Sequence, residues 1–220
     1  MSRAKFVSVN GKIVPWNDGT VHVFSPVVKY GAGLFEGLRG YWNDDKNEMF
    51  LFRLKEHMDR LAYGQRVMRY ERIVDGGTLI DQTIALIRAN EFKEAIHLRV
   101  MVYVDGDGEM GATGPVSVAI TAVPRPLPKQ VVDGVATHVS SWQRISDVAM
   151  PARVKSNANY QNSRLATVQA KADGYGAPLL LNSRGKVSEG PGMCFFMIRD
   201  GKPVTPSISN DILESVTRYM

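Results

Sequence analysis

A proline-rich segment, PRPLPK at residues 124–129, most constrains how this 220-residue chain can fold. Its prolines lack the amide hydrogens that a central β-strand needs, and they favour an extended, semi-rigid connection. The sequence therefore predicts two domains, at residues 1–123 and 132–220, joined by a linker at 124–131. Apolar residues make up 44% of the chain, which is enough for a hydrophobic core.

Two hairpins and two further strands are predicted before the linker. Residues 5–15 hold two β-prone runs around an Asn-Gly dipeptide, which predicts a hairpin. A second hairpin is expected from Leu38 to Arg53 around a cluster of turn formers. Residues 95–104 alternate without a break, and 116–123 form a further strand. The alternation of 95–104 places the following polar or larger side chains on one face: His97, Arg99, Met101 and Tyr103.

Three helices are expected where apolar residues recur at helical spacing. They cover residues 54–69, residues Thr78 to Asn90 and residues 161–173, and Gly174 ends the last one. The apolar stripes are, in chain order, Leu54, Met58, Leu61 and Met68; Ile80, Ile84 and Ile87; and Leu165, Val168 and Ala172.

The part of the chain after the linker is predicted to form a second sheet. A strand is expected within 134–144, ending at Trp142, and three short strands within 178–182, 186–190 and 193–198. Near the end, Asn210 or Asp211 is expected to begin a helix. The predicted fold class is α/β (α+β), with a small N-terminal domain of a sheet and helices and a larger, incomplete C-terminal domain of mixed β-structure.

Composition excludes several classes of function. The net charge is +5 and the pI is 9.3, but the cations are spread along the chain, so no nucleic-acid partner is expected. The single Cys194 excludes an internal disulfide framework, and the four histidines are scattered, so no metal site is expected. The chain does not begin with a signal peptide, and no apolar run is long enough to span a bilayer. A cytoplasmic location is the expectation.

Two segments carry candidate chemistry. In ARVKSNANYQNS, residues 152–163, Lys155 has no long cation on its C-terminal side, and Tyr160 lies five positions further on. A lysine in a tight pocket tends to lose its proton and become a nucleophile toward carbonyl groups. The alternative is a solvated lysine in a loop before a helix. Residues 30–40, rich in glycine, either line a pocket or form a plain connector. Likewise, Arg99 and Tyr103 either face one cavity or belong to an exposed sheet face.

Five motifs occur in order along the chain: YGAGLFEGLR at 30–39, EHMDRL at 56–61, Lys155 with NY at 159–160, SEGPG at 188–192, and LESVTR at 213–218. Together they resemble the fold-type IV pyridoxal-phosphate enzymes, and within that group most of all the branched-chain amino acid aminotransferases. The resemblance runs from the first hairpin to the final residue.

The resemblance implies a role for each of several residues. Lys155 is expected to bind the aldehyde of pyridoxal 5'-phosphate covalently and to move a proton during the reaction. Glu189 corresponds to the partner of the pyridine nitrogen, and Tyr160 to the partner of the phenolic oxygen. The remaining cofactor residues implied are Arg60 and the amides around Val216 and Thr217 for the phosphate, the latter at a helix start, and Leu213 for packing on the ring. The substrate pocket implied by the resemblance is formed by Tyr30, Phe35, Gly37 and Arg99.

The implied activity is transfer of an amino group from a branched-chain or related hydrophobic L-amino acid to 2-oxoglutarate, with Arg99 as a partner for the dicarboxylate. Within the same fold, the alternatives are a D-amino acid or (R)-amine transaminase and an aminodeoxychorismate-lyase-like enzyme. From another class, the alternative is a non-catalytic subunit or fragment. The resemblance also implies a homodimer or higher homo-oligomer.

Three departures from the family pattern bear on these expectations. His97 stands where typical branched-chain enzymes carry tyrosine, and Met193 where many relatives have glutamate. Both concern the substrate rather than the cofactor. Family chains also continue beyond the position of Met220, so we expect a fragment or incomplete gene product, and weak cofactor binding by the 220-residue polypeptide alone.

Overall fold

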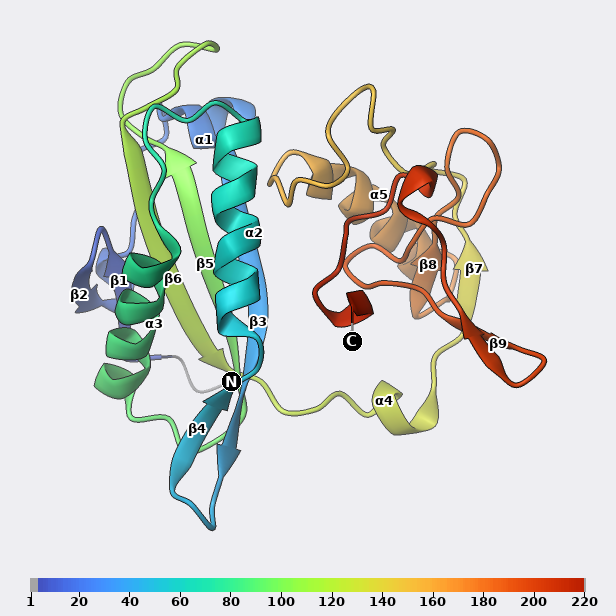
Figure 1. The fold of residues 1–220 in the computed structure, drawn as a ribbon, viewed down its shortest axis with the longest axis horizontal. Helices are drawn as coiled ribbons and strands as arrows, with labels where there is room; N and C mark the ends of the chain where they lie inside the picture. Colours follow the sequence, from blue (N-terminus) through green and yellow to red (C-terminus); the bar gives the residue numbers. More distant parts are fainter. Residues whose placement is uncertain (1–3, 220) are drawn as a thin grey trace. The chain divides into compact units, whose positions relative to one another are not determined.

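The computed structural model describes residues 4–219. The chain divides into two compact units, Met1–Pro128 and Lys129–Met220, and each is described by itself. The break between them falls within the proline-rich segment (Figure 1). Among residues 4–219, no helix is long and apolar enough to cross a membrane.

The first unit is built on a six-stranded sheet in the order β2-β1-β6-β5-β3-β4, with each neighbouring pair antiparallel. Its strands are β1 (Phe6–Val9), β2 (Lys12–Pro15), β3 (Gly33–Asn43), β4 (Glu48–Leu51), β5 (Ile96–Val104) and β6 (Val116–Pro124). Both predicted hairpins are confirmed. Asn10 and Gly11 take positive φ angles of 49° and 79°, as the tight turn of the first hairpin requires.

Residues 30–40 do not form a plain connector, because most of them belong to the long strand β3. This strand pairs with β5 along eight positions, from Gly33 opposite Tyr103 to Gly40 opposite Ile96. The glycines of this segment are therefore places where a neighbouring side chain approaches the strand. At Gly40, for example, an added Cβ would lie 2.8 Å from Ile96 Cγ1.

Helices cover one face of this sheet. Besides the short α1 (Pro26–Tyr30) and the 3-10 turn Trp16–Asp18, the unit contains α2 (Leu54–Val67) and α3 (Gly76–Asn90). Figure 1 shows α2 and α3 side by side on the same face of the sheet. The side chains of β5 that face them, Ile96, Leu98, Val100 and Val102, are fully buried, as the alternation predicts.

The buried stripe of α3 differs from the predicted one. The isoleucines at 80, 84 and 87 are only half-buried, and the fully buried positions are Leu79, Thr83, Leu86 and Asn90. Hydrogen bonds offset the cost of burying the polar side chains of Thr83 and Asn90. The Thr83 hydroxyl donates to the Leu79 carbonyl, and the Asn90 amide donates to the carbonyls of Leu86 and Phe6. A pattern based on hydrophobicity alone therefore selected the wrong side of the helix.

The second unit consists of short elements joined by long irregular segments. They are α4 (Gln130–Asp133), β7 (Thr137–Val139), α5 (Asn159–Ala172), β8 (Ala177–Leu179), β9 (Met197–Arg199), β10 (Lys202–Val204) and the 3-10 turns Ile208–Asn210 and Thr217–Tyr219. β7 and β8 pair in parallel, and α5 lies between them in the chain, as a parallel connection requires. β9 and β10 form a separate hairpin.

The strands predicted for the second unit are only partly correct. Those expected at 178–182, 186–190 and 193–198 do not form one sheet, because β8 pairs with β7, β9 pairs with β10, and Leu181 and Val187 share only an isolated bridge. The strand expected to end at Trp142 ends at Val139. The Ser140 hydroxyl accepts the Trp142 amide and diverts the chain from the strand.

The predicted apolar stripe of α5 is also wrong, although the helix and its end are confirmed. Val168 is 51% exposed, and the buried positions are Asn159, Ser163, Ala166 and Ala170. These side chains are small or hydrogen-bonded, so the helix packs closely without a row of large apolar residues. Gly174 follows the helix with a φ of 81°.

The helix expected to begin at Asn210 or Asp211 is absent from the described residues. Asp211 has a left-handed φ of 60°, whereas a residue that caps a helix start needs an extended backbone. Its carboxylate accepts the amide of Asp147, and the Leu213 amide donates to Glu189. Distant groups thus take the bonds that a helix start would have used, and only the 3-10 turn Thr217–Tyr219 forms.

Candidate active site

The side chains of Lys155 and Tyr160 are in direct contact in the second unit. Lys155 Nζ donates to the phenolic oxygen of Tyr160 at 2.5 Å and lies 4.8 Å from the centre of its ring. Tyr160 stands in the first turn of α5, and Lys155 is half-buried in the loop before it. This geometry argues against a freely solvated lysine.

A buried asparagine gives the loop before α5 its shape. Asn159 is 0% exposed, and its side-chain amide donates to the backbone carbonyls of Pro151 and Val154, at 3.1 and 3.2 Å. Val154, next to the lysine, is itself buried. These two hydrogen bonds fix the backbone that carries Lys155, and neither of them involves the lysine amine.

Glu189 is a buried carboxylate, 7% exposed, whose two oxygens have different partners. Arg144 Nε lies 2.9 Å from Oε1, and the backbone amide of Leu213 donates to Oε2 at 3.1 Å. In the turn after it, a Cβ on Gly190 would lie 2.7 Å from Met193 Cγ, so an alanine there would have to displace the Met193 side chain. Glu189 and Leu213, both predicted cofactor residues, are thus joined by a hydrogen bond.

The two predicted phosphate-binding positions near the end of the chain lie outside any α-helix. Val216 is half-buried and Thr217 is exposed, at the start of the 3-10 turn. A single short turn has no aligned row of amide dipoles, so the described residues lack the expected helix start, and binding of the phosphate by Val216 and Thr217 stays a prediction. Arg218, the next residue, has a buried Nε without a hydrogen-bond partner among the described residues. This segment therefore offers a cationic donor rather than a helix dipole.

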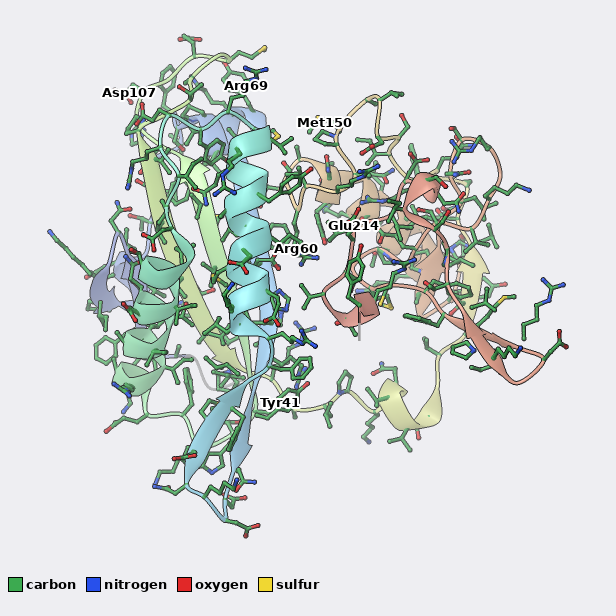
Figure 2. The ribbon with its side chains drawn as sticks, viewed as in Figure 1. Tyr41, Arg60, Arg69, Asp107, Met150 and Glu214 are labelled. Carbon is green, nitrogen blue, oxygen red and sulfur yellow. The ribbon has the colours of Figure 1, made fainter. Side chains whose placement is uncertain are left out.

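Arg60 belongs to a charged cluster in the first unit (Figure 2). Its Nε and one terminal nitrogen donate to the two carboxylate oxygens of Glu36 at 2.6 and 2.7 Å, and His57 Nδ1 lies 2.8 Å from Oε2. Glu36 is 0% exposed on β3, whereas Arg60 and His57 are spaced three residues apart on α2. The carboxylate fixes the plane of the guanidinium.

Three of the four predicted substrate-pocket residues share one face of the first sheet. Phe35 and Gly37 alternate with Glu36 on β3, so they lie on the face opposite the helices, and Gly37 is paired with Arg99 of β5. The Arg99 guanidinium lies 4.5 Å from the centre of the Phe35 ring. Tyr30 belongs to a different element. It ends α1, is 39% exposed, and its ring lies 5.2 Å from Lys29 Nζ.

Sequence reasoning missed three charged residues of these clusters. Glu36 occupies a helix-facing position of an alternating strand between Leu34 and Leu38, so a charge there was a detectable sign of a buried partner. His57 shares a helix face with Arg60 and was detectable in the same way. Arg144 gave no local sign, because its partner lies 45 positions further along the chain.

These groups fit the chemistry of pyridoxal 5'-phosphate. The second unit brings together a primary amine with a phenol and places a buried carboxylate on an arginine. The cofactor needs such groups for its aldehyde, its phenolic oxygen and its ring nitrogen. Within the same unit, Arg218 adds a positive charge suited to a phosphate. The fold and these residues define a pyridoxal-phosphate enzyme.

Comparison with known proteins identifies the family. Residues 33–219 match the model of the class IV amino-transferases. A probable branched-chain-amino-acid aminotransferase of Aquifex aeolicus is 33% identical, over 97% of this chain and 69% of its own. The chain belongs to the class IV aminotransferases.

Solved structures agree with this assignment. The branched-chain aminotransferase of Thermoproteus uzoniensis with norvaline is 35% identical, with a TM-score of 0.93 over 98% of this chain and 72% of its own. A second branched-chain amino acid aminotransferase, complexed with N-(5'-phosphopyridoxyl)-L-glutamate, is 30% identical, with a TM-score of 0.89 over 100% of this chain and 72% of its own.

Proposed function

We propose that this aminotransferase moves the amino group of a branched-chain or related hydrophobic L-amino acid to 2-oxoglutarate, with pyridoxal 5'-phosphate bound to Lys155. The contact between Lys155 and Tyr160 carries the proposal, because it sets the primary amine of a fixed loop beside a phenol in the first turn of α5. The relatives support the substrates, since one was solved with norvaline and another with a phosphopyridoxyl adduct of glutamate.

Each residue then has a chemical task. Bound pyridoxal phosphate supplies an aldehyde and an electron-accepting ring. Lys155 would hold the aldehyde through Nζ, and its amine, when free, would move a proton to or from the substrate α-carbon. Tyr160 orients that amine through the hydrogen bond already present. Glu189 would accept a hydrogen bond from the protonated ring nitrogen, and Leu213 would pack on the ring.

The remaining predicted residues divide between phosphate and substrate. We assign the phosphate to Arg60 and to the segment of Val216 and Thr217. Arg99 presents a guanidinium above Phe35, and such a planar donor suits the second carboxylate of 2-oxoglutarate. Alternation on β3 supports placing Gly37 on the same face, so we assign it to the substrate side. Tyr30 is assigned there from the family pattern.

The direct test measures glutamate formed from 2-oxoglutarate by the purified protein with added cofactor. L-leucine, L-isoleucine, L-valine and L-norvaline are expected to react, and D-leucine and (R)-1-phenylethylamine are not. Preference for the D-amino acid or the (R)-amine would overturn the proposed substrate class. Release of pyruvate from aminodeoxychorismate would instead identify a lyase.

A second test locates the cofactor without relying on turnover. Reduction with borohydride followed by peptide mapping is expected to find the pyridoxyl group on Lys155. Lys171, exposed on α5, is the matched control and is expected to remain unmodified. Label on another lysine would overturn the assignment of Lys155. Size-exclusion chromatography with light scattering tests the expected homodimer separately.

A further inference from the structure

Arg144 is a buried cation. Its side chain is 3% exposed and forms an ion pair with Glu189. Its Nε lies 2.9 Å from Glu189 Oε1 and also donates to the carbonyl of Asp211 at 3.3 Å. A buried guanidinium is rare unless it is paired, because leaving water is costly. Nothing in the family motifs of the sequence assigns a role to this arginine, yet it touches the carboxylate proposed for the ring nitrogen.

The backbone around Arg144 is held by several hydrogen bonds, although the segment is irregular. The Arg144 amide donates to the carbonyl of Leu181 at 2.7 Å. The side chain of Asn162 holds the residues on either side of Arg144. Its Nδ2 donates to the Gln143 carbonyl at 2.8 Å, and its Oδ1 accepts the Ile145 amide at 3.2 Å. Asn162 lies on α5, two positions after Tyr160. The helix that carries Tyr160 therefore also fixes the arginine.

The charge of Arg144 decides where a shared proton rests. A proton between Glu189 and a bound ring nitrogen can sit on the carboxyl oxygen or on the nitrogen. The guanidinium touches the carboxylate, whereas any group on the far side of the carboxylate lies farther away. A positive charge stabilises the nearby anion more than it destabilises a more distant cation. Arg144 therefore favours the carboxylate with the proton on the nitrogen.

The contacts with Arg144 and with the Leu213 amide reach different oxygens of the carboxylate, so together they fix its orientation. Other charged residues are linked to the Asp211 segment: the Asp211 carboxylate accepts the Asp147 amide, and Arg153 Nε lies 3.9 Å from both Asp147 and Glu214.

We propose that Arg144 is a positioning residue of the aminotransferase, which holds Glu189 as an oriented carboxylate so that the ring nitrogen of the bound cofactor keeps its proton. The proposal rests on the proposed function, because it takes Glu189 as the partner of that nitrogen. A structural salt bridge alone would stabilise the fold without affecting the nitrogen, and this difference is measurable.

The test uses the holoenzyme reconstituted with pyridoxal 5'-phosphate labelled with ¹⁵N in the ring. The ¹⁵N chemical shift reports directly whether the nitrogen is protonated. The native protein is expected to show the protonated position at neutral pH. In Arg144→Met the signal is expected to move toward the unprotonated position, with circular dichroism used to confirm folding. A folded Arg144→Met protein with an unchanged signal would overturn the proposal.

Arg144→Lys covers the case in which the methionine variant does not fold. It keeps the charge but loses the planar donor, so the pH at which the nitrogen releases its proton is expected to fall by about one unit. An unchanged titration would count against the proposal. Asp211→Asn is the control, because it removes a neighbouring charge but keeps the carbonyl that Arg144 contacts, and it is expected to leave the signal in place.

The outcomes separate this inference from the proposed function. If the native holoenzyme shows an unprotonated nitrogen, the assignment of Glu189 fails, and the inference fails with it. If the native nitrogen is protonated and Glu189→Gln moves it but both Arg144 variants do not, the assignment of Glu189 survives and only the role of Arg144 is overturned.

Discussion

Glu36 and Arg60 form a buried pair in which one guanidinium reaches both oxygens of one carboxylate, at 2.6 and 2.7 Å. The two residues come from different elements, β3 and α2, so the pair joins the sheet to the helix that covers it. Because Glu36 is 0% exposed, its charge depends on this partner and on His57. The arginine assigned to the phosphate is therefore held in place by the core of its own unit.

Breaking this pair is expected to destabilise the first unit. Glu36→Gln leaves a buried cation without its counter-charge, which costs about 3 kcal/mol of unfolding free energy. Urea unfolding measures the loss as a lower midpoint. Glu48→Gln is the control, because Glu48 is exposed on β4 and is expected to matter by less than about 0.5 kcal/mol. Equal midpoints for the two variants would contradict the prediction.

Loss of the lysine amine is expected to remove transamination. Lys155→Ala should lower kcat/KM by about three orders of magnitude or more, because the nucleophile and the proton carrier are lost together. Tyr160→Phe removes only the phenol that Lys155 contacts, and a loss of about tenfold is expected. Initial rates of glutamate formation measure both. Retention of activity by Lys155→Ala would refute the enzymatic assignment of that residue.

Two glycines of β3 are expected to respond differently to alanine. A Cβ on Gly37 would meet the His97 ring at ordinary contact distances, 3.4 Å to Nε2 and 3.8 Å to Cε1, so Gly37→Ala should change stability by less than about 0.5 kcal/mol while raising KM for leucine. A Cβ on Gly40 would lie 2.8 Å from both Ile96 Cγ1 and Met49 Sδ, and Gly40→Ala should cost about 1–3 kcal/mol. Denaturation and steady-state kinetics distinguish the two effects. An unchanged KM in Gly37→Ala would remove Gly37 from the substrate pocket.

Burial of Tyr70 predicts a loss of stability at alkaline pH. Desolvation raises the pKa of the Tyr70 phenol, and its hydroxyl donates to the Ala32 carbonyl at 3.1 Å. The folded protein therefore keeps a proton that the unfolded chain releases above about pH 10, so the unfolding free energy falls as the pH rises through that value. Tyr70→Phe should reduce this fall, and Tyr63→Phe, exposed on α2, should not. Urea midpoints at pH 8 and 10.5 provide the comparison.

The helix cap of α3 predicts the opposite dependence at acidic pH. Hydrogen bonds from the Thr78 hydroxyl and amide lower the pKa of Asp75, so its contribution is present above about pH 4 and is lost as the pH falls below that value. Asp75→Ala should lower the melting temperature by a few degrees. Asp75→Asn keeps an acceptor and should retain most of the stability but not its pH dependence. Identical acid profiles for native and Asp75→Asn proteins would count against this role.

Local sequence was sufficient for most of the first unit. The Asn-Gly turn and the alternation of 95–104 each act through neighbouring residues, so the patterns and the structure agree. The second unit was predicted less well because its short strands find partners far away in the chain. β8 pairs with β7 across the whole of α5, and no pattern within 178–182 indicates that choice.

The predictions of the buried stripes of α3 and α5 were wrong for a related reason. Hydrophobicity favoured Ile84 and Val168, but packing buried Thr83 and Asn159 instead, because hydrogen bonds to preceding backbone groups satisfied them. Similarly, Asp211 does not cap a helix as predicted, and its carboxylate instead accepts the Asp147 amide. At Asp211 a tertiary bond therefore replaced the local one, whereas Thr83 and Asn159 are satisfied by nearby backbone groups.

The sequence by itself determined the chemical groups and their order. Lys155 and Tyr160, five positions apart around a helix start, predicted a reactive amine beside a phenol, and the motifs predicted an aminotransferase. Only the tertiary structure decided which charges meet, as with Arg144 and Glu189 or Arg60 and Glu36. The physical reason is that a buried ion needs a counter-ion at contact distance, and folding supplies that partner from distant parts of the chain.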